Sequence, residues 1–157
     1  MISIGFRVYS DKKIYYCIVE KLPNDDINYL DISSIDIPRA LTWPEALAYT
    51  RNTILDILNL YAIKKTIIRI AELDGASIER CYIEGVLQET IASSLVEKFL
   101  AGQIAEFTSL LNIPRDHFKK LANNELQFEN IPQEIDWRKL TKAERETILT
   151  ANAALNL

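Results

Sequence analysis

The residue types that most often act as nucleophiles, general bases or zinc ligands are sparse in this chain. His117 is the only histidine, and its sequence neighbours supply neither a nucleophile nor a set of metal ligands at a suitable spacing. Cys17 and Cys81 form no CxxC or Cys/His pattern, and their apolar neighbours favour buried structural thiols. The sequence contains no phosphate-binding loop, nucleotide-binding glycine motif, nucleophile elbow or HExxH helix. These observations exclude nucleotide-dependent, acyl-transfer and zinc-dependent enzymes.

Carboxylates are the remaining candidates for chemistry, because their oxygens are the ligands that Mg²⁺ and Mn²⁺ prefer. Glu72 ends an apolar, β-branched run, Asp74 follows in a loop, and Glu146 lies one turn into the last predicted helix. Each also has a structural explanation. Glu72 can be solvated or paired with a basic residue, Asp74 can form a turn, and Glu146 can complement the helix dipole. The residues alone leave both interpretations open.

Strands that could position these side chains begin the chain. Residues 3–10 and 14–20 are rich in apolar and β-branched side chains, and the polar turn between them predicts a hairpin. Residues 27–37 alternate loosely between apolar and polar side chains, which predicts a half-exposed third strand.

Helices and strands alternate in the rest of the chain. Capping boxes at Thr42–Glu45 and Thr141–Glu144 predict the starts of two helices, and Ser77 can cap a third. The predicted elements are helices at 42–62, 77–102, 115–122 and 140–155, strands at 66–72 and 104–109, and an irregular segment at 123–135. The order β-β-β-α-β-α-β-α with a final helix predicts an α/β fold, in which helices cover both faces of a mixed sheet of about five strands.

Composition predicts one globular domain spanning residues 1–157, with 48% hydrophobic and 25% charged residues. The net charge is −4, and lysines and arginines are scattered rather than gathered in a stripe, which argues against tight non-specific binding of nucleic acid. An acidic nuclease that holds its substrate through metal ions remains compatible with this charge. No signal peptide and no run of about 20 apolar residues is present, so we expect a cytoplasmic protein without membrane contact.

Several local patterns, taken with the element order, resemble the ribonuclease H-like superfamily and its RuvC-type Holliday junction resolvase branch. They are Ser3-Ile4-Gly5-Phe6-Arg7 on the first strand, Ile67-Ile68-Arg69-Ile70-Ala71-Glu72 on the fourth, Gly85 in the following helix, Ala105-Glu106-Phe107-Thr108 as a short strand, Ile113 to Lys120 as a helix opened by Pro114, and Glu146 to Ala151 in the closing helix.

The resemblance implies a metal-dependent nuclease site. In such nucleases, carboxylates from the first strand, the fourth strand and the last helix hold two divalent metals about 4 Å apart. Glu72 and Glu146 match two of these positions, as metal ligands and catalytic residues. Arg7 occupies the position of the central first-strand aspartate, where a guanidinium repels cations and is expected to pair with Glu72. Lys119 and Lys120 match the basic part of a family helix and, with Arg7, are candidates for binding.

The sequence therefore supports three functional hypotheses. The first is a catalytically degenerate domain that acts through a protein partner, a homodimer or weak nucleic-acid binding. The second is an active nuclease that uses Mg²⁺ or Mn²⁺ with a shifted ligand set of Glu72, Asp74 and Glu146, and the third is an oligomerisation or scaffold protein. The first two differ in geometry, because an active site needs converging carboxylates and a degenerate one places the Arg7 guanidinium among them.

Overall fold

A five-stranded mixed sheet forms the centre of the protein in the computed structural model, which describes residues 1–72 and 77–157. The strand order is β3-β2-β1-β4-β5, with β1, β2 and β3 antiparallel and β4 and β5 parallel to β1. The strands are β1 (Ile2–Ser10), β2 (Lys13–Lys21), β3 (Ile27–Asp36), β4 (Lys65–Arg69) and β5 (Lys98–Gly102).

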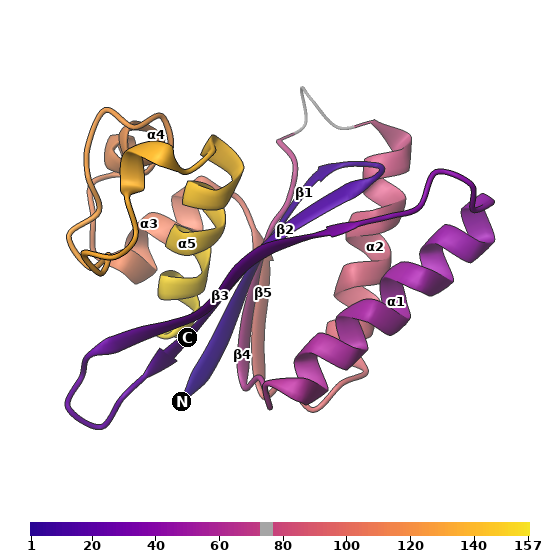
Figure 1. Cartoon of the computed structure of the whole chain (residues 1–157), viewed down its shortest axis with the longest axis horizontal. Helices are drawn as coiled ribbons and strands as arrows, with labels where there is room; N and C mark the ends of the chain where they lie inside the picture. Colours follow the sequence, from indigo (N-terminus) through magenta and orange to yellow (C-terminus); the bar gives the residue numbers. More distant parts are fainter. Residues whose placement is uncertain (73–76) are drawn as a thin grey trace.

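Helices cover both faces of this sheet, as Figure 1 shows. One face carries α1 (Trp43–Leu60) and α2 (Ile78–Ala92), and the other carries α3 (Ile104–Leu111), α4 (Arg115–Ala122) and α5 (Lys142–Ala154). This three-layer arrangement confirms the predicted α/β fold with its mixed five-stranded sheet. None of the helices in the described ranges is long and apolar enough to cross a membrane.

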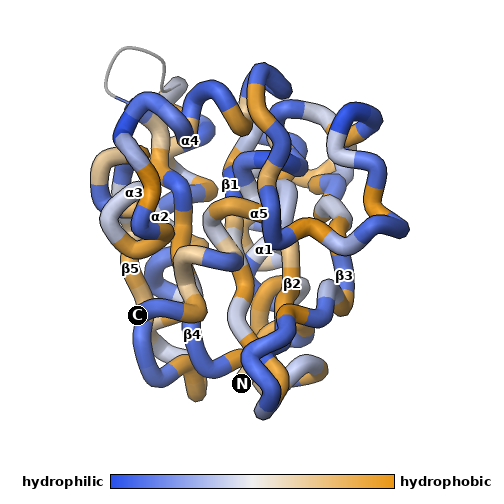
Figure 2. The backbone as a smooth tube through the Cα atoms, turned by 90° about the vertical axis from the view of Figure 1, so that its left-hand side faces the viewer, coloured by the Kyte–Doolittle hydropathy of each residue, from blue (hydrophilic) through white to orange (hydrophobic). Residues whose placement is uncertain are grey.

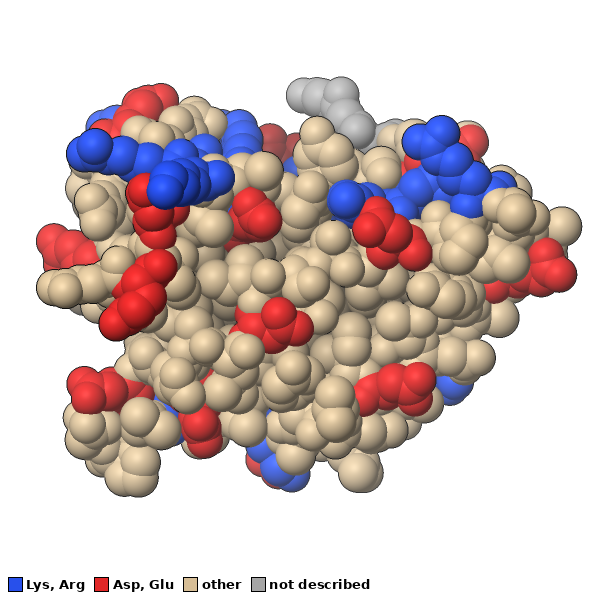
Figure 3. Space-filling view, in the orientation of Figure 1, with Lys and Arg blue, Asp and Glu red and all other residues tan. Residues whose placement is uncertain are grey.

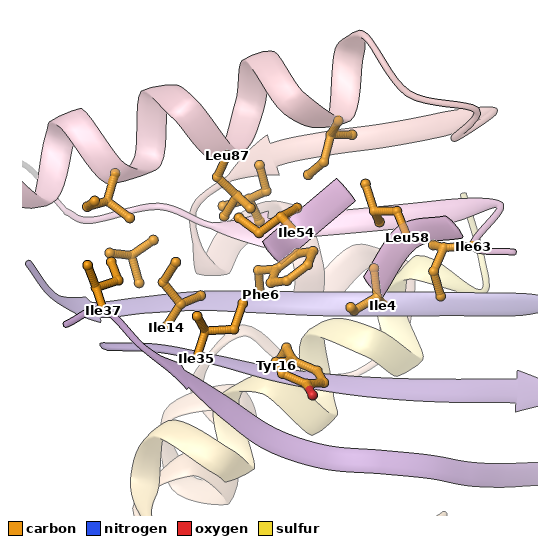
Figure 4. Close-up of a cluster of buried hydrophobic side chains, with 14 of the residues drawn as sticks. Ile4, Phe6, Ile14, Tyr16, Ile35, Ile37, Ile54, Leu58, Ile63 and Leu87 are labelled. Carbon is orange, nitrogen blue, oxygen red and sulfur yellow. The ribbon is translucent and has the colours of Figure 1, made fainter. Parts of the chain in front are cut away.

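The core under α1 and α2 follows from the alternation of side chains along β1. Because successive residues of a strand point to opposite faces, Ile4, Phe6 and Val8 all point to this side and are fully buried. Ile54 and Leu58 of α1, one turn apart, pack against them (Figure 4). The helix stripe and the strand alternation thus produce one continuous apolar layer.

The core on the opposite face depends on a close approach between α5 and β1. A Cβ atom at Gly5 would lie 2.4 Å from the backbone nitrogen of Ala151 and 2.7 Å from the carbonyl oxygen of Thr147. The Ser3 hydroxyl donates to the Ala151 carbonyl at 2.9 Å, which ties the same strand to the same helix. Figure 2, which views this face, shows α5 crossing in front of the sheet, with hydrophilic segments at the periphery.

Helix starts agree with the capping signals in the sequence. The Thr42 backbone N–H donates to Glu45 Oε2 at 2.8 Å, and the Thr141 N–H donates to Glu144 Oε2 at 2.6 Å. Ser77 accepts from the Arg80 backbone N–H and begins α2. The helix predicted at 115–122 has these bounds in the structure.

Three predictions are wrong: the strand at 104–109, the end of the helix at 77–102 and the burial of Cys81. Residues 104–109 form the start of α3 instead of a strand, because Glu106 caps the helix by accepting from the Gln103 N–H at 2.7 Å. The fifth strand lies earlier, at Lys98–Gly102, and α2 therefore ends at Ala92 instead of continuing to about residue 102. Cys17 is buried as predicted, but Cys81 is exposed on α2.

Tyr16 makes the stability of the fold depend on pH. Its hydroxyl donates to Asp31 Oδ2 at 2.8 Å, and burial, followed by this hydrogen bond, raises the pKa of Tyr16 from 10.0 to about 12. Because the folded-state pKa is raised, the stabilisation by the neutral phenol is complete below about pH 10 and is lost as the pH rises toward about 12. We expect the stability advantage of the wild type over Tyr16→Phe, measured by urea denaturation, to shrink across this window. An advantage that does not change with pH would contradict this assignment.

Candidate functional site

The candidate site lies at the edge of the sheet where β1 and β4 end. The carboxyl ends of parallel strands meet at one edge, and in Figure 1 this is the upper edge, where α5 also begins. Arg7 is the last residue of β1 that pairs with β4, Arg69 is the last residue of β4, and Glu146 lies in the second turn of α5. All three side chains are largely buried.

Arg7 and Arg69 are directly opposite each other in the parallel register of β1 and β4, so both side chains point to the α5 face. Like charges in this position repel, and one carboxylate compensates for them. Glu146 Oε2 lies 2.8 Å from Arg7 Nε and 3.8 Å from Arg69 Nε. The Glu146 side chain is only 6% exposed, so this carboxylate is held inside the protein by two guanidinium groups.

A second buried ion pair extends the cluster toward α2. Arg80 Nε lies 3.0 Å from Glu84 Oε1, one turn further along the helix, and both side chains are about nine-tenths buried. The same Glu84 oxygen accepts a hydrogen bond from the Ala71 backbone N–H at 2.9 Å, just beyond β4. Glu84 therefore connects α2 to the end of the strand that supplies Arg69.

Glu72 lies at the solvent side of the cluster. It is three residues beyond β4, its side chain is 50% exposed, and Glu72 Oε1 lies 3.5 Å from Arg69 Nη2. The expected pairing of Arg7 with Glu72 is therefore wrong, because Arg7 pairs with Glu146 and Glu72 contacts Arg69. The third carboxylate of the proposed ligand set, Asp74, lies outside the described residues.

Electrostatics at the site are dominated by arginine. Burial lowers the pKa of Arg7 from 12.5 to about 10; the Glu146 carboxylate opposes this shift, whereas the charges of Arg69 and Arg80 add to it. Arg7 remains protonated at neutral pH, because the lowered pKa still lies well above 7. The site thus holds several guanidinium cations in close proximity.

This arrangement does not fit a divalent metal ion. Metal ligands of the carboxylate type must offer their oxygens to the ion, but Glu146 Oε2 already faces the guanidinium groups of Arg7 and Arg69. Among the described residues, no group of three or more histidine, cysteine or acidic side chains could hold a metal ion. A cation at this position would meet positive charge instead of a free carboxylate.

An open groove of about 680 Å³ adjoins the cluster at Glu72. Its other lining residues include the exposed cations Arg115 and Lys119 and the acidic Asp116, on the first turns of α4. Lys120 does not line this groove and instead pairs with Asp116 at 2.5 Å. The groove therefore brings Glu72 and Lys119, both named from the sequence, to one surface.

Basic side chains gather on this side of the molecule. Figure 3 shows Lys and Arg along the upper edge of the view, over α4 and the start of α5 on one side and around the β1–β2 turn and the loop before α1 on the other. Asp and Glu predominate lower on the same face. The edge that contains the candidate site is thus more basic than the net charge of −4 indicates.

Three members of the cluster were not identified from the sequence, namely Arg69, Arg80 and Glu84. A signal for them was present. Arg69 interrupts the apolar run of β4, which is unusual for a buried strand, and Arg80 and Glu84 are spaced one turn apart on the face of α2 that also carries Leu87. The signal for these three residues was therefore a charged side chain on a face that is predicted to be buried.

The fold is similar to that of known Holliday junction resolvases, although no protein-family model and no curated protein sequence matches the chain. Thermus thermophilus RuvC in complex with a Holliday junction substrate matches with a TM-score of 0.69 and 8% identity, over 99% of this chain and 94% of that chain. The yeast mitochondrial Holliday junction resolvase matches with a TM-score of 0.58 and 12% identity, over 98% of this chain and 78% of that chain. The chain thus has the RuvC-type, ribonuclease H-like fold, as predicted.

Proposed function

We propose that this protein is a RuvC-like domain that binds nucleic acid without cleaving it. The observation that carries the proposal is the ion pair between Arg7 and Glu146, with Arg69 on the other side of the same carboxylate oxygen. Two-metal nucleases need carboxylates that are free to hold cations and so activate water and stabilise the leaving oxygen. Here the same region of the fold holds guanidinium groups, which attract phosphate but supply neither of these functions.

Nucleic acid is the favoured ligand because positive charge gathers at this edge of the sheet. Exposed lysines and arginines there can neutralise backbone phosphates, which is the main source of non-specific affinity. One structural neighbour, Thermus thermophilus RuvC, was solved in complex with a Holliday junction substrate. The overall charge of −4 favours weak, salt-dependent binding over tight binding.

The proposal predicts that the protein does not bind catalytic metal. Calorimetric titration with Mn²⁺ should detect no micromolar binding, either for the wild type or for Glu72→Gln, because arginine charge repels the ion. A labelled four-way DNA junction should also remain intact with Mg²⁺ or Mn²⁺. Cleavage that disappears in Glu72→Gln would contradict the proposal and would support the alternative of an active nuclease with a shifted carboxylate set.

Binding itself is tested by fluorescence anisotropy with the same junction at low salt. We expect Lys119→Gln in the groove to weaken binding and Lys64→Gln to leave it unchanged. Lys64 is a suitable control because it is exposed and lies before β4, at the opposite edge of the sheet from the site. Equal effects of the two substitutions, or no binding, would contradict the proposed interface.

Self-association is a second candidate function, and exposed apolar side chains on α2 favour it. Ile78 is 68% exposed and Tyr82 is 52% exposed, one turn apart on the same helix. A second copy of the chain could cover both side chains in a symmetric contact. Light scattering should then detect a dimer that Tyr82→Ser weakens, whereas a monomer at high concentration would contradict this candidate.

A further inference from the structure

Arginine nitrogens at the candidate site are buried without hydrogen-bond partners. Five buried side-chain polar atoms in the described residues have no partner, and three of them are Arg7 Nη1, Arg69 Nε and Arg80 Nη2. Burying an N–H donor without an acceptor costs free energy, and the cost is larger when the donor belongs to a cation. Their concentration in one cluster points to an acceptor that this cluster is built to receive.

The charges of the cluster indicate the kind of acceptor. Glu146 lies beside Arg7 and Arg69, and Glu84 pairs with Arg80, so three guanidinium groups and two carboxylates are buried and the set carries one excess positive charge. A water molecule would accept hydrogen bonds but would leave this charge uncompensated. An oxyanion would accept the hydrogen bonds and would also compensate the excess positive charge. Phosphate oxygens suit the forked N–H groups of arginine.

We propose that Arg7, Arg69 and Arg80 form an anion site that binds a phosphate group, and that Glu72 occupies the solvent side of this site until the anion arrives. Glu72 Oε1 is already an anionic oxygen facing the buried Arg69 guanidinium. Its contact is long, at 3.5 Å, and its side chain is half exposed, so a better acceptor can displace it.

The phosphate can be free or part of a nucleic-acid backbone, and the second source rests on the proposed function. Glu72 also lines the groove that contains Arg115 and Lys119. A phosphodiester chain with one phosphate at the arginine cluster could therefore continue along this groove, with neighbouring phosphates near these two cations.

Calorimetric titration with inorganic phosphate at constant ionic strength tests the site. Arg80→Gln should weaken phosphate binding by about tenfold or more, the usual effect of losing a charge-assisted hydrogen bond. The matched control is Arg51→Gln, since Arg51 pairs with Glu89 in the same way on the exposed surface. Equal losses in the two variants, or no phosphate binding by the wild type, would overturn the proposal.

Glu72→Gln provides a second test that does not disturb the buried pairs. Removing a competing negative charge should tighten phosphate binding several-fold, whereas Glu97→Gln, at an exposed ion pair with Lys64, should have no effect. Unchanged or weaker binding in Glu72→Gln would show that Glu72 does not occupy the approach to the site.

Competition with a labelled single-stranded DNA separates the two sources of phosphate. Displacement of the DNA by phosphate, with both ligands weakened by Arg80→Gln, would identify the backbone as the ligand. Phosphate binding through Arg80 without any DNA binding would support a site for free phosphate and contradict the proposed function. DNA binding that is insensitive to Arg80→Gln and to phosphate would overturn the anion site and leave the proposed function intact.

Discussion

Replacing Arg7 with methionine is expected to lower the free energy of unfolding by about 3–5 kcal/mol, the usual effect of removing one partner of a buried ion pair. The reason is the burial of Glu146, whose carboxylate would keep only the more distant Arg69 at 3.8 Å. Methionine retains most of the apolar volume of the arginine stem, so the loss reports on charge more than on packing. Urea denaturation at neutral pH measures the effect.

A double-mutant cycle separates this pair from its surroundings. Glu146→Gln in the Arg7→Met background should restore part of the lost stability, because the stranded charge is removed. The control is Lys64→Met, which breaks an exposed pair with Glu97 of similar length, 2.9 Å, and should cost less than about 1 kcal/mol. Comparable losses in Arg7→Met and Lys64→Met would show that burial does not strengthen the Arg7 pair.

Substitution of alanine for Gly5 should produce the second large effect. The added Cβ would lie 2.4 Å from Ala151 N and 2.7 Å from Thr147 O, and both are backbone atoms that cannot rotate away. Since carbon atoms pack at about 3.5–4.0 Å, α5 would have to move away from β1 by about 1 Å. We expect a loss of about 1–3 kcal/mol or more in urea denaturation, as for other overpacked cores.

Gly85 offers a matched control for this substitution. It lies on the exposed side of α2, and a Cβ there would meet nothing within 4 Å. Gly85→Ala should therefore stabilise the protein by up to about 1 kcal/mol, the difference in helix propensity. A neutral result for Gly5→Ala beside this gain would show that α5 adapts to the extra methyl group and that the close approach is unimportant.

The substitutions at Arg7 and Gly5 affect the same helix, α5. Glu146 lies on the same helix as Thr147 and Ala151, whose backbone contacts Gly5. Moving α5 away from the sheet would also lengthen the contact between Glu146 and Arg7. Gly5→Ala is therefore expected to weaken phosphate binding as well, if the arginine cluster depends on Glu146 to hold Arg7 and Arg69 in place.

Local signals in the sequence were sufficient for most of the elements. Helix starts can be predicted at Thr42, Ser77 and Thr141, because a cap is a hydrogen bond between residues that are two or three positions apart. The paired runs at the start of the chain likewise predict a hairpin from a short turn. These features depend on neighbours in the chain, so the chain alone reveals them.

The fifth strand was not predictable in the same way. The run at 104–109 is short and only half apolar, and so short a run suits a strand or a short helix equally well. The true strand, Lys98–Gly102, exists because β4 offers it a parallel partner, with Arg69 opposite Gly102. Strand pairing of this kind is a property of the folded sheet and leaves little local trace.

The α/β class, the helix caps and the arginine at the position of the resembled nucleases' carboxylate could all be predicted from the order of the residues. The pairing of Arg7 with Glu146 instead of Glu72, and the presence of Arg69, Arg80 and Glu84 near the same site, became apparent only in the folded protein. The physical reason is that ion pairs form between side chains brought together by sheet register and by the close approach of α5 to Gly5. These are long-range contacts, whereas capping and side-chain alternation act over a few residues.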